Sequence, residues 1–148
     1  MSILWNNIKH FRSWEFDDPD FPGSGREMDE KPVIILNMIR EETGWPIHVT
    51  AGIDTLGRHH AKNSYHNEEQ GALAVDWYFG ADIPSRIQYY TLESYGIPAI
   101  GIYYDWRKWN AKKEEWELIP IGFHTDWRNI EKCQRWVRNR GEYIYLLR

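Results

Sequence analysis

The sequence predicts an α+β domain with a mostly antiparallel central sheet and helices packed against it. Three observations lead to this prediction. Apolar residues fall at helical spacing in residues 29–44, short β-rich apolar runs follow at several places, and the two patterns interleave without a regular strand–helix–strand repeat. A length of 148 residues suits a single domain, which can bury about two-thirds of its unfolded surface and fold without disulfides.

Composition and charge argue against several classes of function. The net charge of −4 and the isoelectric point near 5.9 disfavour nucleic-acid binding, because phosphate binding needs a concentrated basic face and the Lys and Arg residues are scattered among acids. The single cysteine, Cys133, permits no internal disulfide and no cysteine-based zinc site. No apolar run approaches the ~18 residues of a membrane span. Because one cysteine cannot form a metal site, any metal would be held by His, Asp and Glu.

The first 63 residues are expected to form an arm, a helix, a strand and a loop. Residues 1–28 predict an irregular arm wrapped over the domain, because Asp, Pro and Gly crowd its later part. The helix begins after Asp29, a plausible N-cap, and ends at Gly44. Residues 47–50 form a short β-like run, and the glycines and polar residues of 51–63 are typical of a loop.

Strands and helices are expected to alternate through the rest of the chain. The apolar, β-rich run at residues 72–79 predicts a strand with Asp76 in or near its middle. A carboxylate in so apolar a strand requires a strong partner. The remaining expected elements are a helix at 82–95, a strand at 99–104, a polar turn region at 105–113, a strand at 116–127 interrupted by Pro120 and Gly122, a short basic helix at 129–138 and a final strand at 143–147.

The stretch SYHNEEQGALAVD, residues 64–76, carries the candidate chemistry. It contains an imidazole at His66 and a carboxylate at Asp76. With His124 from GFHTDWR, these would make a two-histidine, one-carboxylate set of the kind that zinc hydrolases use, with one position left for water. Spacing alone leaves another interpretation open. His66 could cap a loop, Asp76 could pair with an arginine, and His124 could lie half exposed on a strand.

Residues 64–76 resemble the SxH...GxAxD signature of the zinc D-alanyl-D-alanine carboxypeptidases and related phage endolysins, which cut peptidoglycan stem peptides. FRSWEF resembles an early stretch of this family, and MDEKPVIILNMIREETGWPIHVTAG resembles its helix and the strand that ends in a T-S-G-like turn. AIGIYY and GFHTDWR resemble its glycine-rich strand and its HxD strand. The resemblance implies a hedgehog/DD-peptidase-like fold, a Zn²⁺ ion held by His66, Asp76 and His124, and Ser64 beside the site.

Three departures from the family pattern bear on catalysis. The separation of His66 and Asp76 is ten positions, where the commonest members have seven, and the added NEEQ suits an exposed loop. Asp54 stands where many members carry an arginine that holds a substrate carboxylate. Arg58 or Lys62 could replace that arginine, and only Arg58 offers a bidentate fork. The positions where several relatives place a general base hold Ile121 and Gly122.

The proton acceptor that peptide hydrolysis needs must therefore come from elsewhere. Asp126 is the best local candidate for this catalytic role, because it lies two residues past His124 on the same face of a regular strand. The alternative is that Asp126 orients the His124 ring. Further candidates for the proton acceptor are His59, His60, Glu68 and Glu69.

The resemblance implies a zinc metallopeptidase of peptidoglycan, either a D-Ala-D-Ala carboxypeptidase or an L-Ala-D-Glu-type endopeptidase, acting as a phage or prophage lysin or as a bacterial cell-wall enzyme. Its partner would be the stem peptide, with Arg58 and Ser64 as candidate substrate-binding residues. The alternatives are a catalytically silent metal-binding relative in a wall-binding or virion structure, and a plain interaction domain. The start of the chain lacks a signal-peptide pattern. We therefore expect a protein that is cytoplasmic until lysis or a phage-type route delivers it, and we expect it to be a monomer.

Overall fold

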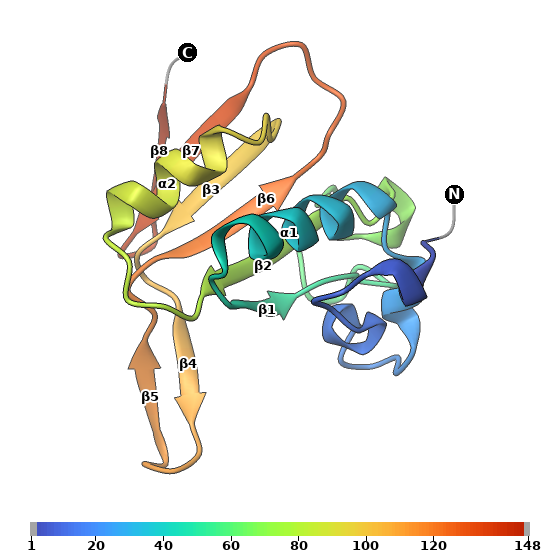
Figure 1. Ribbon diagram of the computed structural model, residues 1–148, viewed down its shortest axis with the longest axis horizontal. Coiled ribbons are helices and arrows are strands. Elements are labelled where there is room, and N and C mark those ends of the chain that lie inside the picture. Colours follow the sequence, from blue (N-terminus) through green and yellow to red (C-terminus); the bar gives the residue numbers. More distant parts are fainter. Residues whose placement is uncertain (1–2, 147–148) are drawn as a thin grey trace.

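A six-stranded mixed sheet forms the centre of the protein, and the computed structural model describes residues 3–146 (Figure 1). The strands lie in the order β1-β2-β6-β3-β7-β8, and all neighbours are antiparallel except β3 and β7, which are parallel. The architecture is α+β, with a mixed sheet. The bounds are β1 (Ile47–Ala51), β2 (Ala74–Phe79), β3 (Ala99–Tyr103), β6 (Gly122–Asp126), β7 (Gln134–Asn139) and β8 (Glu142–Leu146).

Two α-helices, α1 (Glu30–Thr43) and α2 (Ser85–Glu93), cover one face of this sheet (Figure 1). The start of α1 is fixed by Asp29, whose Oδ1 accepts a hydrogen bond from the Lys31 N–H at 2.9 Å. Its end is fixed by Gly44, whose φ of 71° is favourable only without a Cβ. The helices predicted at residues 29–44 and 82–95 are therefore confirmed. Within residues 3–146, no helix is long and apolar enough to cross a membrane.

The helix-covered face of the sheet carries the main hydrophobic core. Side chains alternate between the two faces of a strand, so every second residue of β2, β3 and β6 points to the helices. Trp77, Ile100 and Phe123 lie on this face and are fully buried, together with Leu36 of α1 and Leu92 of α2. The residues between them on the same strands point to the opposite face, where the candidate site lies.

A row of four paired residues crosses the opposite face of the sheet. Asp76 pairs with His124, His124 with Gly101, and Gly101 with Trp136. A Cβ on Gly101 would lie 2.4 Å from Nε1 of Trp136, so the missing side chain allows the indole to cover this part of the sheet. The indole N–H donates to the Tyr103 hydroxyl at 3.0 Å. This register places the two predicted ligands of β2 and β6 side by side.

The segment between β3 and β6 differs from the prediction. The expected polar turn region, 105–113, contains β4 (Arg107–Asn110), which pairs with β5 (Glu115–Leu118) in a hairpin that projects away from the main sheet (Figure 1). The expected single strand at 116–127 is two strands, β5 and β6, that belong to different sheets. Pro120, which cannot donate to a strand ladder, lies between them.

The predicted basic helix at residues 129–138 is wrong, because its second half is β7. Arg135 explains the error. It is only 3% exposed, and its guanidinium donates to the Glu93 carboxylate at 2.5 Å and to the Ile97 carbonyl at 3.0 Å. These partners are distant in sequence, so no local pattern reports them. Cys133, expected inside the helix, lies exposed just before the strand.

The N-terminal arm has no α-helix and no strand of the sheet within residues 3–28, and it packs beside the candidate site. Phe16 is fully buried, and its carbonyl accepts the Ile53 N–H at 3.0 Å. A Cβ on Gly52 would lie 2.3 Å from that carbonyl oxygen, so this close approach requires glycine. Residues 1–2 of the predicted arm and residue 147 of the predicted last strand lie outside the described residues. The arm contains three short 3₁₀ helices, Trp5–Asn7, Ser13–Phe16 and Ser24–Glu27.

Candidate metal centre

Asp76 is the residue on which the candidate site converges. Its Oδ1 lies 2.8 Å from Nδ1 of His124 and 3.1 Å from Nε2 of His66. The two rings are also neighbours, with centroids 5.1 Å apart. Burial raises the pKa of Asp76, but the two imidazoles outweigh burial and hold this pKa well below its ordinary value. The structure therefore brings together the three residues that the sequence predicts as metal ligands.

His66 reaches Asp76 from the loop between β1 and β2. The loop is fixed on both sides of the ring, because the His66 N–H donates to Ser64 Oγ at 3.2 Å and the His66 carbonyl accepts the Asp54 N–H at 2.9 Å. The residue is 1% exposed, and its Nδ1 donates to the Gly52 carbonyl at 2.8 Å. A carbonyl only accepts, so Nδ1 carries the proton and Nε2 is the nitrogen available to a metal.

His124 is held from its far side by Asp126. Nε2 of His124 lies 2.8 Å from Oδ2 of Asp126, which is fully buried. Burial lowers the pKa of His124, but the hydrogen bonds to Asp126 and Asp76 outweigh burial and raise the pKa to about 9. With Nε2–H directed at Asp126, Nδ1 is the nitrogen that faces Asp76 and is available to a metal.

Arg128 engages both oxygens of Asp126. Its Nε lies 2.7 Å from Oδ1, and its Nη2 lies 2.6 Å from Oδ2. Burial raises the pKa of Asp126, but the bonds from Arg128 and His124 lower it to about 2. The guanidinium also lies over the Tyr65 and Trp136 rings, 4.5 and 5.6 Å from their centroids. These contacts favour an orienting role for Asp126 over that of a proton acceptor.

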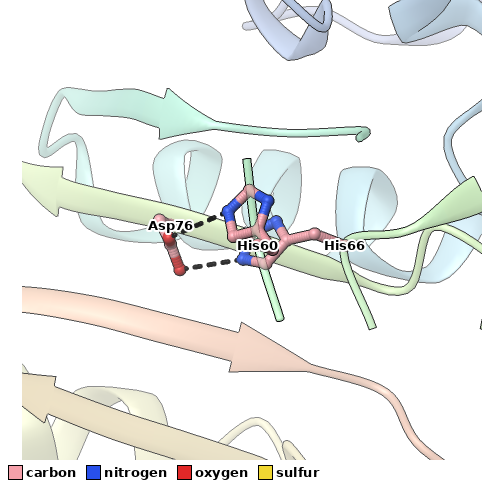
Figure 2. Close-up of side chains that lie close together, drawn as sticks. All are labelled: His60, His66 and Asp76. Atoms are coloured by element: carbon pink, nitrogen blue, oxygen red, sulfur yellow. Dashed lines mark hydrogen bonds and ion pairs between the residues drawn. The ribbon is translucent and has the colours of Figure 1, made fainter. Parts of the chain in front are cut away.

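The structure adds His60 to the cluster, a residue outside the predicted ligand set. Its Nε2 lies 3.9 Å from Oδ2 of Asp76, and its ring stacks on that of His66 with centroids 3.9 Å apart (Figure 2). Burial and the neighbouring His66 lower the pKa of His60, although a hydrogen bond to Asp54 opposes them. One ligand atom from each of His60, His66 and Asp76 falls within 4.8 Å of the other two.

Asp54 holds His60 in this position. The fully buried carboxylate accepts hydrogen bonds from the backbone N–H of Arg58 at 3.0 Å, from that of His59 at 2.9 Å and from Nδ1 of His60 at 3.0 Å. Burial raises the pKa of Asp54, but these bonds outweigh it and lower the pKa. The residue that replaces an expected arginine therefore organises the loop. The adjacent histidines His59 and His60 were the signal in the sequence that could have identified this part of the site. The direction of each ring depends on the turn that Asp54 closes.

A second group of ionisable residues lies where the arm meets the same loop. Nε2 of His59 lies 3.0 Å from Oδ2 of Asp20 and 3.4 Å from Oδ1 of Asp18. Asp18 is 2% exposed, and its Oδ2 also accepts the N–H and the hydroxyl of Thr55, each at 2.8 Å. Within residues 3–146, this group and the group at Asp76 are the two that could hold a metal ion.

The remaining predicted site residues lie on the same loop but differ in placement. Ser64 is half buried beside His66, where its hydroxyl accepts a backbone hydrogen bond. Arg58 is exposed, and its backbone N–H, rather than its guanidinium, joins the Asp54 network. Glu68 and Glu69 are exposed as well, in a single 3₁₀ turn, Glu68–Gln70, that accommodates the longer insertion.

The donor atoms around Asp76 suit a small transition-metal ion. Neutral imidazole nitrogens and a carboxylate oxygen are ligands of zinc, with bonds of about 2.0–2.2 Å and neighbouring ligands about 3.3 Å apart in a tetrahedron. The nitrogen–oxygen separations of 2.8 and 3.1 Å are near that value. His124 is not part of the group whose ligand atoms all fall within 4.8 Å of one another, which comprises His60, His66 and Asp76, so the predicted set of His66, Asp76 and His124 meets at the shared carboxylate. No protein-family model matches the chain, and no curated protein or solved structure matches it.

Proposed function

We propose that the chain is a zinc-dependent peptidase that hydrolyses peptide bonds in the stem peptides of bacterial peptidoglycan. One observation carries the proposal: His66 and His124 each direct one nitrogen at Asp76 and have the other held by an oxygen acceptor. That arrangement fixes the ring orientation and is typical of metal-ligating histidines. In this proposal the α+β architecture is of the hedgehog/DD-peptidase-like kind that the sequence resembles.

The site chemistry follows from the donors and from their surroundings. When bound, zinc would lower the pKa of a water molecule and polarise the scissile carbonyl. The protein would hold the ligands in place: the Gly52 carbonyl orients His66, and the buried Asp126 orients His124. Arg128 in turn neutralises the Asp126 carboxylate, which keeps a buried charge paired. The assignment of Asp126 as the catalytic proton acceptor stays a prediction, and its contacts support the orienting role instead.

Arg58 and Ser64 are the candidate substrate-binding residues of this proposal. Arg58 is exposed on the loop that carries His66 and could pair with a carboxylate of the stem peptide. Ser64 would act indirectly, through its hydrogen bond to the His66 backbone. Asp54 accepts three hydrogen bonds from its own loop and stands where an arginine would hold a substrate carboxylate. The proposal therefore favours cleavage within the stem peptide over removal of a free C-terminal D-alanine.

A second candidate function is a catalytically silent, metal-binding module of a wall-binding or virion structure. The observation that favours it is the position of His60, whose Nε2 lies 3.9 Å from Oδ2 of Asp76 and could supply a fourth ligand. A site closed by four protein ligands is typical of structural zinc. The two functions share a metal centre and differ in whether a wall peptide is cut.

Two measurements on the purified protein test these functions. Zinc bound per chain should approach one, and it should be lost in His124→Ala; absence of metal after purification and after reconstitution would remove both functions. Release of new amino groups from purified peptidoglycan should exceed that of Asp76→Ala, and mass spectrometry of the fragments would identify the bond. Equal release by the two proteins across several wall types would favour the silent module.

A further inference from the structure

We propose that His60 is a fourth protein ligand of the metal held by Asp76, so that the resting centre has three imidazoles and one carboxylate. The inference rests on the proposed metal centre and adds a regulatory feature to it. With four protein ligands the coordination sphere is closed, and the position that peptide hydrolysis requires becomes available only when His60 moves away or the coordination number rises to five.

The position of His60 is the first argument. Its Nε2 faces Asp76 Oδ2 at 3.9 Å, while Nε2 of His66 faces Oδ1 of the same carboxylate at 3.1 Å, and both rings approach Asp76 from one side (Figure 2). The two rings are stacked at 10° to each other. Stacked rings direct their nitrogens nearly parallel, so the His60 ring would have to tilt toward Asp76 for both nitrogens to bind one ion at the roughly 3.3 Å separation of tetrahedral ligands.

The hydrogen bond on the far side of the ring is the second argument. Nδ1 of His60 lies 3.0 Å from the Asp54 carboxylate, which accepts a hydrogen bond from Nδ1–H, so the lone pair of the neutral ring is on Nε2. His66 and His124 are held in the same way, by the Gly52 carbonyl and by Asp126. All three imidazoles around Asp76 therefore share the carboxylate– or carbonyl–histidine–metal arrangement.

The burial of Asp54 is the third argument. This carboxylate is inaccessible to solvent, and two backbone N–H groups of its own loop bind it, so its position is fixed before His60 is added. An exposed loop histidine would need no such support. The adjacent His59 provides the contrast, because its ring turns the other way, to Asp20 at 3.0 Å, and its side chain is 38% exposed. One turn thus separates a histidine of the metal centre from one that binds the arm.

The number of imidazole ligands bound to zinc in the wild-type protein can be measured directly. X-ray absorption at the zinc edge of the zinc-loaded wild type should fit three imidazoles and one carboxylate oxygen. A fit with two imidazoles would overturn the proposal, and this measurement needs no variant that could fail to fold.

Access to the metal is tested with Co²⁺ in place of zinc and azide as the probe. The visible spectrum of the wild-type Co²⁺ protein should change little with azide, whereas His60→Ala and His60→Gln should bind azide at least about tenfold more tightly. His59→Ala is the matched control and should behave like the wild type. Equal azide affinity in the wild type and both His60 variants would overturn the proposal.

Activity then separates this inference from the proposed peptidase. If His60 closes the centre, His60→Ala should release amino groups from peptidoglycan faster than the wild type when both are saturated with Zn²⁺, and it should bind Zn²⁺ more weakly than the wild type in competition with a chelator. Three imidazoles by X-ray absorption, with no wall hydrolysis by either protein, would support the fourth ligand and contradict the peptidase. Two imidazoles with wall hydrolysis would do the reverse.

Discussion

The two groups of histidine and aspartate in this protein are built from the same residue types but in different ways. In the group at Asp76, the carboxylate and His124 come from paired central strands, and the ring nitrogens not directed at Asp76 have oxygen acceptors. In the group of Asp18, Asp20 and His59, the residues come from the arm and a loop, and the His59 side chain is 38% exposed.

This difference is why we propose a metal centre at Asp76 and an ion-pair cluster at Asp18. A metal ligand must offer a lone pair in a fixed direction, which a buried acceptor behind the imidazole supplies. In the second group, Oδ2 of Asp18 is engaged by Thr55 and Oδ1 accepts the Asp20 N–H at 2.8 Å, so its carboxylate is already used to join the arm to the loop. Histidine and aspartate lying close together are therefore weaker support for a metal site than the bonds behind them.

The largest expected effect is the loss of the shared carboxylate. Asp76→Asn should lower Zn²⁺ affinity by more than about 100-fold, beyond the usual effect of an outer partner, because Oδ1 contacts both His66 and His124. Competition with a chromogenic chelator measures this change. Asp20→Asn in the other group is the matched control and should leave Zn²⁺ affinity at the centre within about twofold. Comparable losses in both variants would break the distinction between the groups.

A smaller loss is expected when the group behind a ligand is changed. Asp126→Asn keeps the shape of the side chain but weakens the acceptor of the His124 Nε2–H, so Zn²⁺ affinity should fall about 10- to 100-fold. The same chelator competition measures it, with circular dichroism to check folding. If Asp126 is instead the proton acceptor, the variant would bind Zn²⁺ as the wild type does and would lose wall hydrolysis alone.

The His124 ion pairs predict how the stability of the chelator-treated protein depends on pH. The pKa of His124 is about 9 in the folded chain, above its ordinary value of 6.5, so the folded state binds this proton more tightly. The contribution to the free energy of unfolding is fully present below pH 6.5 and is lost as the pH rises through 9.

Denaturant unfolding at the two ends of this range measures the effect. The wild type should lose roughly 1–3 kcal/mol between them, and His124→Gln should lose less, since it lacks the titrating ring. An equal loss in the two proteins would show that other groups determine the dependence.

Much of the fold was predictable because its signals are local. Asp29 and Gly44 mark the ends of α1 by the hydrogen bond and the backbone conformation that each supplies. The strand β7 was mistaken for a helix because what stabilises it is not local: parallel pairing with β3 and the burial of Arg135 against Glu93. Charge and helical spacing in the sequence do not report such contacts.

The candidate site also contains residues that were predictable from the sequence and residues that were not. Asp76 and His124 lie on paired strands, where alternation and register determine the direction of a side chain, and His66 was predicted from the motif that it shares with Asp76. His60 and Asp54 belong to a loop whose turn is closed around the buried Asp54 carboxylate. The direction of the His60 ring follows from that closure and not from spacing, so the ligand set predicted from sequence was one histidine smaller than the set proposed from the structure.

The smallest expected effect concerns the second group. His59→Ala removes an exposed ion pair with Asp20 and a longer one with Asp18, and such pairs contribute about 0–1 kcal/mol. The free energy of unfolding should therefore change by less than about 1 kcal/mol, as measured by denaturant titration in the presence of Zn²⁺. A loss of several kcal/mol that depends on Zn²⁺ would mean that the second group also holds a metal.

The most direct test of the metal centre is an anomalous difference map from crystals of the zinc-loaded protein. The strongest peak should lie about 2.0–2.2 Å from Oδ1 of Asp76, Nε2 of His66 and Nδ1 of His124. No peak at Asp76, whether or not one appears between Asp18, Asp20 and His59, would contradict the account.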